Sequence, residues 1–543
     1  MHGRHLRLMA VLVAMVLVAA CTGQTASPTP SGSASQPSSP NEPSPSNTGP
    51  RELVVAERDI HYEGDENTPQ IAMFPSAGVF ETLVVSDVNL QVQPGLATSW
   101  EVLDGDIWRF HLKPGVTLHS GRALDATAVA EVLNKVAIPD SNWQYFNLLG
   151  LVEGAARVVD DLTVDLHVPK SKRVLEVLTN TSYAIWDTQA GNPNVTPVGT
   201  GPFKFVEYVK DQRLVVEKFE GYWGTPPGLD KITFRYIPDE TSRMLALQAG
   251  EVQMVRNVTP AAAAEAARAG LSGYTLIQSN PGSYRAWGFS PHLDAPYDLG
   301  KNINIRRAVA AAIDRDALVE LLWPGFAEPN TTYTVPSILG SSASLVAGPT
   351  YDPDAARQLL EDDGWEAGSD GIRVKDGRRL TLQINLSPDH DTLAEGEAIQ
   401  SMLKEVGIEL TVDVVPDQAA DRARYDEGRG DLWSHIGFLT VPDPCNPCYR
   451  HLPSGHPNSD ARTSRLFDAG TEYASLVDSA LGATDPAEVQ KFSALAMQNL
   501  VDTQALVIPI AGLGSIYAIS DGVTGLVPHP SFTNVDWGTI TFQ

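Results

Sequence analysis

The stretch "PGLATSWEVLDGDIWRFHLKPGVTLHSGRALDATAV", residues 94–129, carries the clearest local structural pattern of the chain. Every second residue from Trp108 to Leu112 is apolar, which predicts a β-strand with one buried face. The segment "KPGV" (113–116) predicts a turn. Asp125 precedes a run with helical apolar spacing and predicts the start of a helix. A strand, a turn and a helix therefore follow one another here, as in a mixed α/β protein.

The same mixture of strands and helices continues toward the C-terminus. The predicted elements are a hairpin in 198–224, strand–helix–strand in 230–255, an amphipathic helical region in 302–323, a helix in 352–365 that begins at Asp352 or Asp354 and ends at Gly364, and strand–helix–strand in 380–416. No repeat of fixed period is present. The chain is long enough for two or three lobes with substantial cores.

The N-terminus has the pattern of an export signal. Arg4 and Arg7 precede an unbroken apolar run, Leu8 to Val18, and two alanines then lead to Cys21. The run is shorter than the about 20 residues that span a membrane. The ending "VAAC" resembles the lipobox of bacterial lipoproteins, which implies cleavage of residues 1–20 and a lipid on Cys21. The alternatives are an ordinary signal peptide with an incidental cysteine and an uncleaved anchor.

Residues 22–50 have the composition of a linker. Ser, Pro, Thr and Gly dominate, no aromatic residue occurs, and Glu42 is the only charge. Such a segment cannot bury enough apolar surface to offset its ordering entropy. As a flexible coil it would span about 30 Å. We therefore expect an extracytoplasmic domain tethered to the outer face of the cell membrane through Cys21.

The charge balance argues against a nucleic-acid partner. The chain has 66 acidic residues against 39 Lys and Arg, a formal net charge of -27. Nucleic-acid binding depends on Lys and Arg that neutralise phosphates, so no nucleic acid is expected. After the signal, the most apolar stretch is 505–519, which Pro509, Gly512 and Gly514 interrupt. It is predicted to form buried strands.

No catalytic signature stands out. The chain contains no His-Glu-x-x-His, no Walker phosphate loop, no dinucleotide Gly-x-Gly-x-x-Gly and no Gly-x-Ser-x-Gly. "VGTGPF" (198–203) has only two close glycines and does not precede a helix. A binding protein is therefore favoured over an enzyme, and no cofactor is predicted.

The order of these segments resembles the extracellular solute-binding proteins of peptide- and nickel-type ABC importers, family 5. The resemblance covers nearly all of 51–543. Its motifs are the Leu-Ala-x-x-Trp and strand–turn–helix of 94–129, followed in the family's order by "GTGPFKFVEY", "GYWG", "DETSRMLALQAGEVQMV", "NINIRRAVAAAIDRDAL" and "DPDAARQLLEDDGW".

The resemblance implies an α/β, two-lobed periplasmic-binding-protein (Venus-flytrap) fold of the class with an extra inserted domain. The implied division is lobe I in 51–82, 200–287 and 509–543, the inserted domain in 83–199, and lobe II in 288–508. A monomer would close on a small solute and deliver it to an ABC permease and its ATPase subunits. The alternatives are a secreted enzyme on the same scaffold and a sensor or chaperone-like binder that transfers nothing.

The resemblance also implies where the ligand binds: at the end of the first strand, at the inserted domain, and at a second-lobe strand near an Asp-Pro, here within 430–452. We expect Trp433, Trp287 and Tyr62 to be ligand-binding aromatics. The alternative for each is an ordinary core residue.

Thr440 occupies the place where many peptide binders of the family carry an acid for the peptide's amino group. No Asp or Glu occurs from Leu432 to Pro442. This departure argues against an ordinary free-amine peptide and leaves an oligopeptide of another kind, a metal chelate or another small solute.

"CNPCYRHLPSGH" (445–456) is a second departure from the family. We expect Cys445 and Cys448 to form a disulfide, because exported proteins are oxidised. Zinc bound with His451 and His456 and a pair of free thiols are the alternatives, and no metal is assigned. A redox-active role lacks a thioredoxin-like βαβ context.

Overall fold

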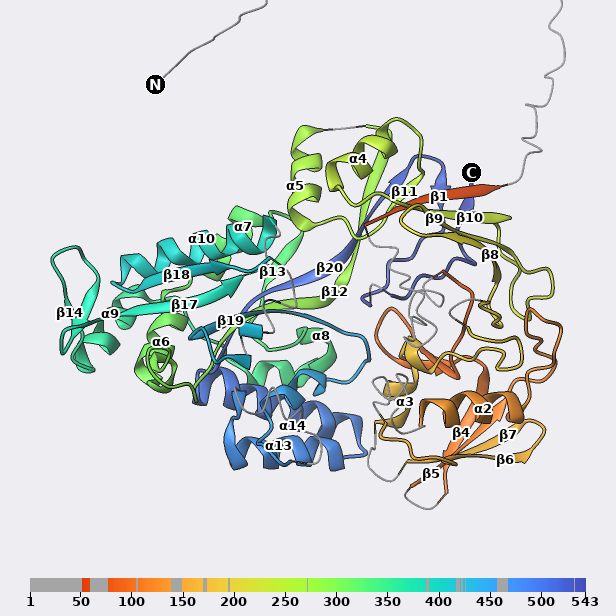
Figure 1. The fold of residues 1–543 in the computed structure, drawn as a ribbon, viewed down its shortest axis with the longest axis horizontal. Coiled ribbons are helices and arrows are strands. Elements are labelled where there is room, and N and C mark those ends of the chain that lie inside the picture. The colour runs from red at the N-terminus through yellow and green to blue at the C-terminus, as the bar shows by residue number, and fades with distance from the viewer. Residues whose placement is uncertain are drawn as a thin grey trace, which may run out of the picture. The chain divides into compact units, whose positions relative to one another are not determined.

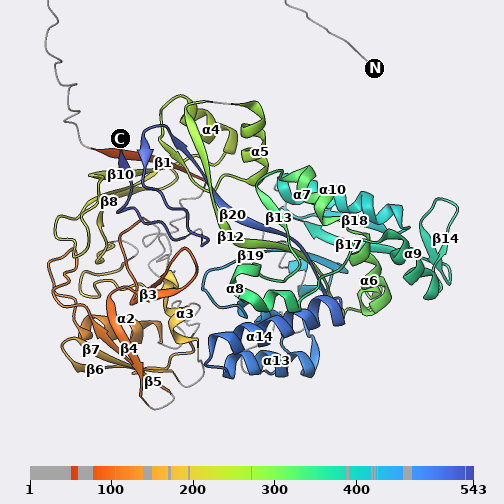
Figure 2. The same ribbon diagram turned by 180° about the vertical axis from the view of Figure 1, so that it is seen from behind.

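The computed structural model describes residues 51–543 with these gaps: 59–76, 104–105, 138–148, 169–172, 194–195, 271, 387–389, 417–419, 421–422, 425, 457–466 and 532. The chain from Pro50 to Gln543 forms one compact unit. Helices and strands are mixed throughout this unit (Figures 1 and 2). Cys21, the rest of the linker and Tyr62 lie outside the described residues.

The stretch 94–129 forms the elements that its pattern predicts. β4 (Ala97–Val102) pairs with β5 (Ile107–Leu112), and the turn leads to α2 (Ala126–Val136). The Asp125 carboxylate caps this helix by accepting from the Ala128 amide at 2.8 Å. A four-stranded sheet results, in the order β4, β5, β7 (Thr163–His167) and β6 (Ala156–Asp160). The buried apolar side chains of this sheet pack against α2.

A larger sheet of eleven strands forms the centre of the structure. Its strands, in spatial order, are β18 (Glu409–Val414), β17 (Thr381–Leu386), β19 (Leu432–Phe438), β12 (Tyr274–Phe289), β20 (Val507–Ser520), β11 (Met254–Val255), β1 (Glu52–Glu57), β10 (Lys231–Tyr236), β9 (Arg213–Lys218) and β8 (Phe203–Val209), with β13 (Ala327–Pro329) also on β20. β1 runs parallel to β10 and β11. The two long strands β12 and β20 are antiparallel and connect the two halves of the sheet.

Helices cover both faces of the sheet around β12 and β19 (Figures 1 and 2). One face, here called the α10 face, packs on α6 (Ile303–Ala312), α7 (Arg315–Leu322), α9 (Pro353–Asp362) and α10 (His390–Glu405). The other, the α14 face, packs on α8 (Pro336–Leu339), α13 (Gly470–Gly482) and α14 (Pro486–Gln498). Because successive strand residues point to opposite faces, neighbouring side chains of β12 enter different cores.

A separate apolar cluster joins β1, β11 and β20 to α4 (Glu240–Gln248) and α5 (Pro260–Ala269). The remaining elements are short. They are β2 (Val84–Ser86), β3 (Val92–Pro94), α3 (Val174–Leu178), β14 (Glu366–Ala367), β15 (Arg373–Lys375), β16 (Arg378–Arg379), β21 (Val523–Thr524), β22 (Thr541–Phe542), a π-helical turn (Asn499–Thr503), and the 3-10 turns Thr181–Tyr183, Leu299–Lys301, Gly340–Leu345 and η5 (Asn446–His451).

Most local predictions are confirmed. The hairpin of 198–224 is β8 and β9, the unit of 380–416 is β17, α10 and β18, and the apolar stretch of 505–519 is part of β20. The helical region of 302–323 is two helices, because the Asp314 carboxylate accepts from the Ala317 amide at 2.9 Å and starts α7 anew. For the helix in 352–365, Asp352 is the cap.

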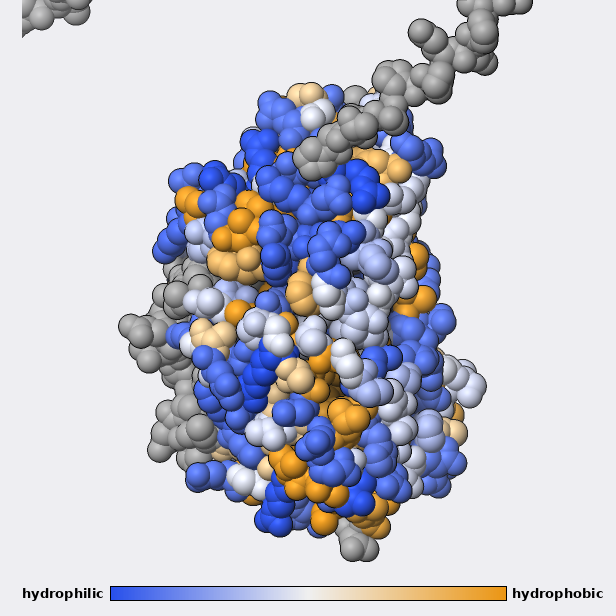
Figure 3. Space-filling view, turned by 90° about the vertical axis from the view of Figure 1, so that its right-hand side faces the viewer, coloured by the Kyte–Doolittle hydropathy of each residue, from blue (hydrophilic) through white to orange (hydrophobic). Residues whose placement is uncertain are grey.

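The surface is mainly polar on the side that Figure 3 shows, where hydrophobic residues form separate groups among hydrophilic ones. Exposed apolar surface is normal for a folded protein in water, because there is not enough polar surface to cover it. Within the described residues, none of the helices has the length and apolar content needed to cross a membrane.

Candidate ligand site

Two glycines allow aromatic rings to lie across β12 and β19. In the register of these strands Gly288 is opposite Trp433, and Tyr284 is opposite Gly437. A Cβ at Gly288 would lie 2.1 Å from the Trp433 ring, and one at Gly437 would lie 2.0 Å from the Tyr284 ring. The Trp433 indole N–H donates to the Phe289 carbonyl at 3.3 Å. Each ring thus covers the glycine of the neighbouring strand, which fixes both rings on the α14 face.

These rings belong to a larger cluster of aromatic and histidine side chains. Tyr333 lies 5.4 Å from the ring of His451 and 6.0 Å from that of His435, and Trp433 lies 5.1 Å from Phe467, between ring centroids. Such separations are typical of favourable edge and tilted contacts. Two buried polar atoms of the cluster, Tyr333 Oη and His451 Nε2, have no hydrogen-bond partner among the described residues.

The two histidines of the cluster are uncharged at neutral pH. Burial lowers the pKa of His451 to about 3, and the nearby Arg450 guanidinium adds to the lowering. Burial also lowers the pKa of His435 well below its usual value, again with a contribution from Arg450. Both imidazoles can therefore donate and accept hydrogen bonds without carrying charge.

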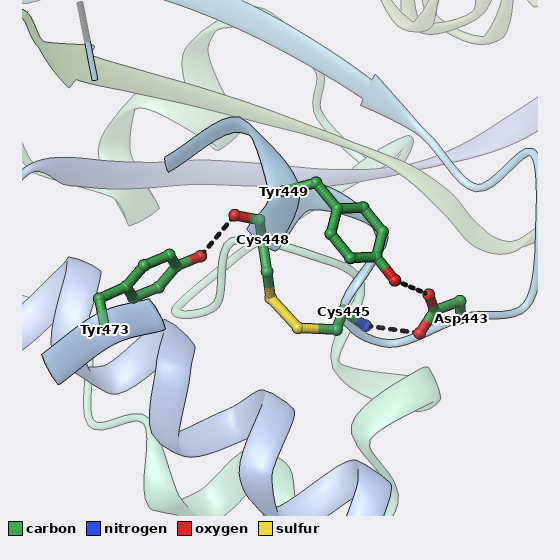
Figure 4. Close-up of a disulfide and its surroundings, with 5 residues drawn as sticks. All are labelled: Asp443, Cys445, Cys448, Tyr449 and Tyr473. Atoms are coloured by element: carbon green, nitrogen blue, oxygen red, sulfur yellow. Dashed lines mark hydrogen bonds between the residues drawn. A yellow bond between two sulfur atoms is a disulfide. The ribbon is translucent and has the colours of Figure 1, made fainter. Parts of the chain in front are cut away.

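The loop after β19 is held in place by polar contacts and a disulfide (Figure 4). The Asp443 carboxylate accepts from the Cys445 amide at 3.0 Å and from the Tyr449 hydroxyl at 2.9 Å. The Tyr473 hydroxyl donates to the Cys448 carbonyl at 2.8 Å. Cys445 and Cys448 form a disulfide with their Cα atoms 5.0 Å apart. Burial raises the pKa of Asp443, and the two hydrogen bonds oppose that rise.

This part of the chain meets residues from around α3. The Asn180 side-chain amide donates to the Thr440 carbonyl at 3.4 Å. Arg173 donates to the Ala483 carbonyl and forms an ion pair with Glu176 at 3.3 Å. The bonds of Asn180 to Thr440 and of Arg173 to Ala483 join segments 260 and 310 residues apart in the chain. The predicted inserted domain therefore touches the predicted second lobe beside the 433–451 strand and loop.

The two predicted tryptophans do not share a surface. Trp287 is opposite Ser434 in the register, one position away from the Gly288–Trp433 pair, so it points to the α10 face. It is fully buried in the core there, and its indole N–H donates to Glu395 at 2.5 Å. We therefore exclude Trp287 from the ligand surface that we propose.

Of the other predicted residues, Trp433 is also buried, in the aromatic cluster next to the loop after β19, and Thr440 is exposed two residues beyond β19. Tyr62 lies outside the described residues. Sequence reasoning missed Tyr284, Tyr333 and His435. The alternation of Trp433 and His435 along one strand could have indicated His435. Nothing local to Tyr333 indicates that it packs on this strand.

Each histidine that could have served as a zinc ligand has one ring nitrogen engaged by another group. His451 Nδ1 is 3.1 Å from the Phe467 carbonyl, and His456 Nε2 is 3.0 Å from the Asp478 carboxylate. In the described part of the chain, no group of three or more His, Cys, Asp or Glu side chains could hold a metal ion. The arrangement thus leaves the disulfide as the role for Cys445 and Cys448.

We predict that thiol titration of the denatured protein, without reductant, finds neither Cys445 nor Cys448 reactive. The bridge closes a very short loop, so its stabilisation should be below the about 3 kcal/mol expected for a 15-residue loop. Changing both cysteines to Ser should alter solute affinity more than melting temperature. Two reactive thiols with stoichiometric zinc, or a large loss of stability with unchanged affinity, would contradict this interpretation.

A cavity of about 1240 Å³ lies elsewhere, between α4, α5 and α7. Its lining includes Ser283 and Arg285 of β12 and Ile436 and Phe438 of β19, which point to the face opposite Tyr284 and His435. None of its lining residues comes from 83–199. Because the ligand is expected to contact that segment, the cavity fits the expected site less well than the loop after β19, where Asn180 contacts Thr440.

Comparison with known proteins agrees with this architecture. The bacterial extracellular solute-binding proteins, family 5 Middle, match residues 91–459. Glutathione-binding protein GsiB of Pectobacterium atrosepticum is 30% identical over 378 residues, 68% of this chain and 69% of that protein. Heme-binding protein A of Haemophilus influenzae is 26% identical over 475 residues, 81% and 83% of the two chains. The structure of NikA from Brucella suis in complex with Fe(III)-EDTA superposes with a TM-score of 0.79 at 22% identity, covering 91% and 100%.

The fold is that of a two-lobed periplasmic-binding protein with an extra domain, the class that the sequence predicts. Within this class, the chain belongs to the bacterial extracellular solute-binding proteins of family 5.

Proposed function

We propose that this chain is the substrate-binding component of an ABC importer, which captures a small solute between two lobes and passes it to a membrane permease. The observation that carries the proposal is the hydrogen bond of Asn180 to the Thr440 carbonyl beside the aromatic cluster, together with that of Arg173 to the Ala483 carbonyl. Two lobes that close on a solute need segments that face each other across the site in this way. A solute favours the closed form only through its higher affinity for that form.

The proposal includes the predicted division of the chain. Lobe I takes 51–82, 200–287 and 509–543, the inserted domain takes 83–199, and lobe II takes 288–508. We infer that β12 and β20 cross between the lobes. The two strands pair with each other along most of their length. On their other edges, β20 pairs with β11 and β12 pairs with β19. The hinge of closure then lies in these two strands.

The proposed ligand surface comprises exposed Thr440 and half-buried His435. The buried rings of Trp433, Tyr284 and Tyr333 support this surface from below. Related proteins are named for glutathione and heme, and one holds Fe(III)-EDTA. These solutes differ widely in shape, so the family alone does not define the solute here. The proposal therefore includes three kinds of solute: an oligopeptide whose binding does not depend on its free amino group, a metal chelate, and another small solute.

Thermal unfolding of the purified protein with glutathione, glycylglycine, hemin and Fe(III)-EDTA tests the proposal. A solute at about 100 times its dissociation constant should stabilise the folded state by about 2.7 kcal/mol and raise the melting temperature. The solute should be recovered unchanged after incubation. Chemical turnover of a solute by the pure protein would favour the alternative, a secreted enzyme on this scaffold.

We propose that Cys21 is the mature N-terminus and carries lipid. The basic, apolar and small-residue order before it and the polar linker after it support this. Changing Cys21 to Ala should move the protein from the membrane fraction of cells to the soluble fraction, whereas Thr22→Ala should not. If the Cys21→Ala protein stays equally bound to the membrane, residues 8–18 act as an uncleaved anchor and the lipid is not the tether.

A further inference from the structure

Arg450 is an exposed cation beside the ligand surface, within η5. Among the described residues, no ion pair or hydrogen bond of its side chain is found, whereas most other arginines of the described chain have a carboxylate or carbonyl partner, such as Arg173 and Arg373. An arginine that keeps its guanidinium unpaired retains five donors for a ligand.

The backbone that carries Arg450 is held on both sides. Tyr449 before it donates to buried Asp443, and His451 after it is buried and bonded to the Phe467 carbonyl. The Cys445–Cys448 disulfide closes the preceding turn. A side chain on a rigid support loses less conformational freedom when it binds, which favours recognition.

Among the described residues, the titratable groups that Arg450 acts on carry no charge that would compensate its own. Its field acts on Tyr284, Tyr333, His435 and His451, and all four are neutral at neutral pH because burial raises the pKa of the tyrosines and lowers that of the histidines. The nearest acid in sequence, Asp443, is buried and hydrogen-bonded within its own loop.

We propose that Arg450, together with half-buried His435, binds an anionic group of the solute, a carboxylate, on the surface of the aromatic cluster. This inference rests on the proposed transport function and narrows the class of solute. A guanidinium binds a carboxylate through two parallel hydrogen bonds, and a neutral imidazole adds a donor. The unpartnered Tyr333 Oη and His451 Nε2 beneath the surface offer further hydrogen bonds to a ligand oxygen or an ordered water.

The protein as a whole is strongly acidic, so the binding of an anionic solute depends on a local cation such as Arg450. With a formal net charge of -27, the chain repels anionic solutes at long range. The absence of any Asp or Glu from Leu432 to Pro442, which argues against recognition of a free amine, suits the opposite preference. The site would thus select the acidic end of a solute where peptide-binding relatives are expected to select the basic end.

Titration calorimetry of the full mature chain with two matched pairs of probes tests this inference. The pairs are glycylglycine with its C-terminal amide and glutathione with its diethyl ester. The wild-type protein should bind the carboxylate member of a pair at least about tenfold more tightly. Arg450→Gln should weaken carboxylate binding about ten- to a hundredfold and remove the preference, while Arg450→Lys should retain part of it.

Arg157→Gln is the matched control, because it removes the same charge from an exposed arginine on the edge strand β6. It should leave both affinities unchanged. Wild-type binding without a carboxylate preference, or an unchanged preference in Arg450→Gln, would overturn the inference and leave the transport function standing. If the wild-type protein binds neither member of either pair, the inference fails together with a transport function for such solutes.

Discussion

Replacing Glu395 by alanine is expected to lower the free energy of unfolding by about 3–5 kcal/mol, because the change leaves a buried charge without its partner. Glu395 is fully buried and pairs with Arg285 of β12, itself almost fully buried. The same carboxylate accepts from Trp287 at 2.5 Å. Arg285 also donates to Thr392 at 3.0 Å. Removing the carboxylate leaves a guanidinium charge and an indole N–H in a low-dielectric core.

Urea unfolding measures this effect, with Glu397→Ala as the control on the exposed side of the same helix. The control should change stability by less than about 0.5 kcal/mol. The loss in free energy of unfolding for Glu395→Gln should lie between those of the two alanine variants, because the amide keeps the side-chain volume and one acceptor but loses the charge. If Glu395→Ala is as mild as Glu397→Ala, the network does not anchor β12 to α10.

Replacing Gly288 by alanine is expected to destabilise the protein by about 1–3 kcal/mol, the cost of overpacking a filled core. The new Cβ would overlap the Trp433 ring at 2.1 Å, and the ring is held by Phe467 and the Phe289 carbonyl. The ring must move, so solute affinity and the fluorescence of Trp433 should change with stability.

Gly482→Ala is the control for this substitution, because nothing lies within 4 Å of the new Cβ at the end of α13. The free energy of unfolding of Gly482→Ala should equal that of the wild-type protein or be slightly higher, since alanine favours the helix. Unchanged stability and affinity in Gly288→Ala would mean that Trp433 can leave the strand freely, and that the glycine–aromatic pairing does not position the ligand surface.

The local structure was predictable where neighbouring residues decide it. The alternation from Trp108 to Leu112 predicts β5, and Asp125 predicts the start of α2, because both depend on side chains a few residues away. The break between α6 and α7 was missed, although Asp314 followed by apolar residues is itself a start signal.

The ligand surface was predictable only in part, because it depends on strand register. Trp287 and Trp433 lie on adjacent strands, and a shift of one position decides which face each reaches. Tyr333 joins the cluster from about 100 residues away, and Asn180 touches Thr440 across 260 residues. Contacts of this range leave no pattern in the sequence around either partner.

The most direct test of the central claim is mass spectrometry of the small molecules that the purified native protein releases on denaturation. The proposed function predicts a stoichiometric solute that rebinds to the refolded protein and is recovered unchanged, and the inference about Arg450 predicts that this solute carries a carboxylate. A released compound that the pure protein converts into another, or a native protein that neither releases nor rebinds any solute, would contradict a role in solute capture.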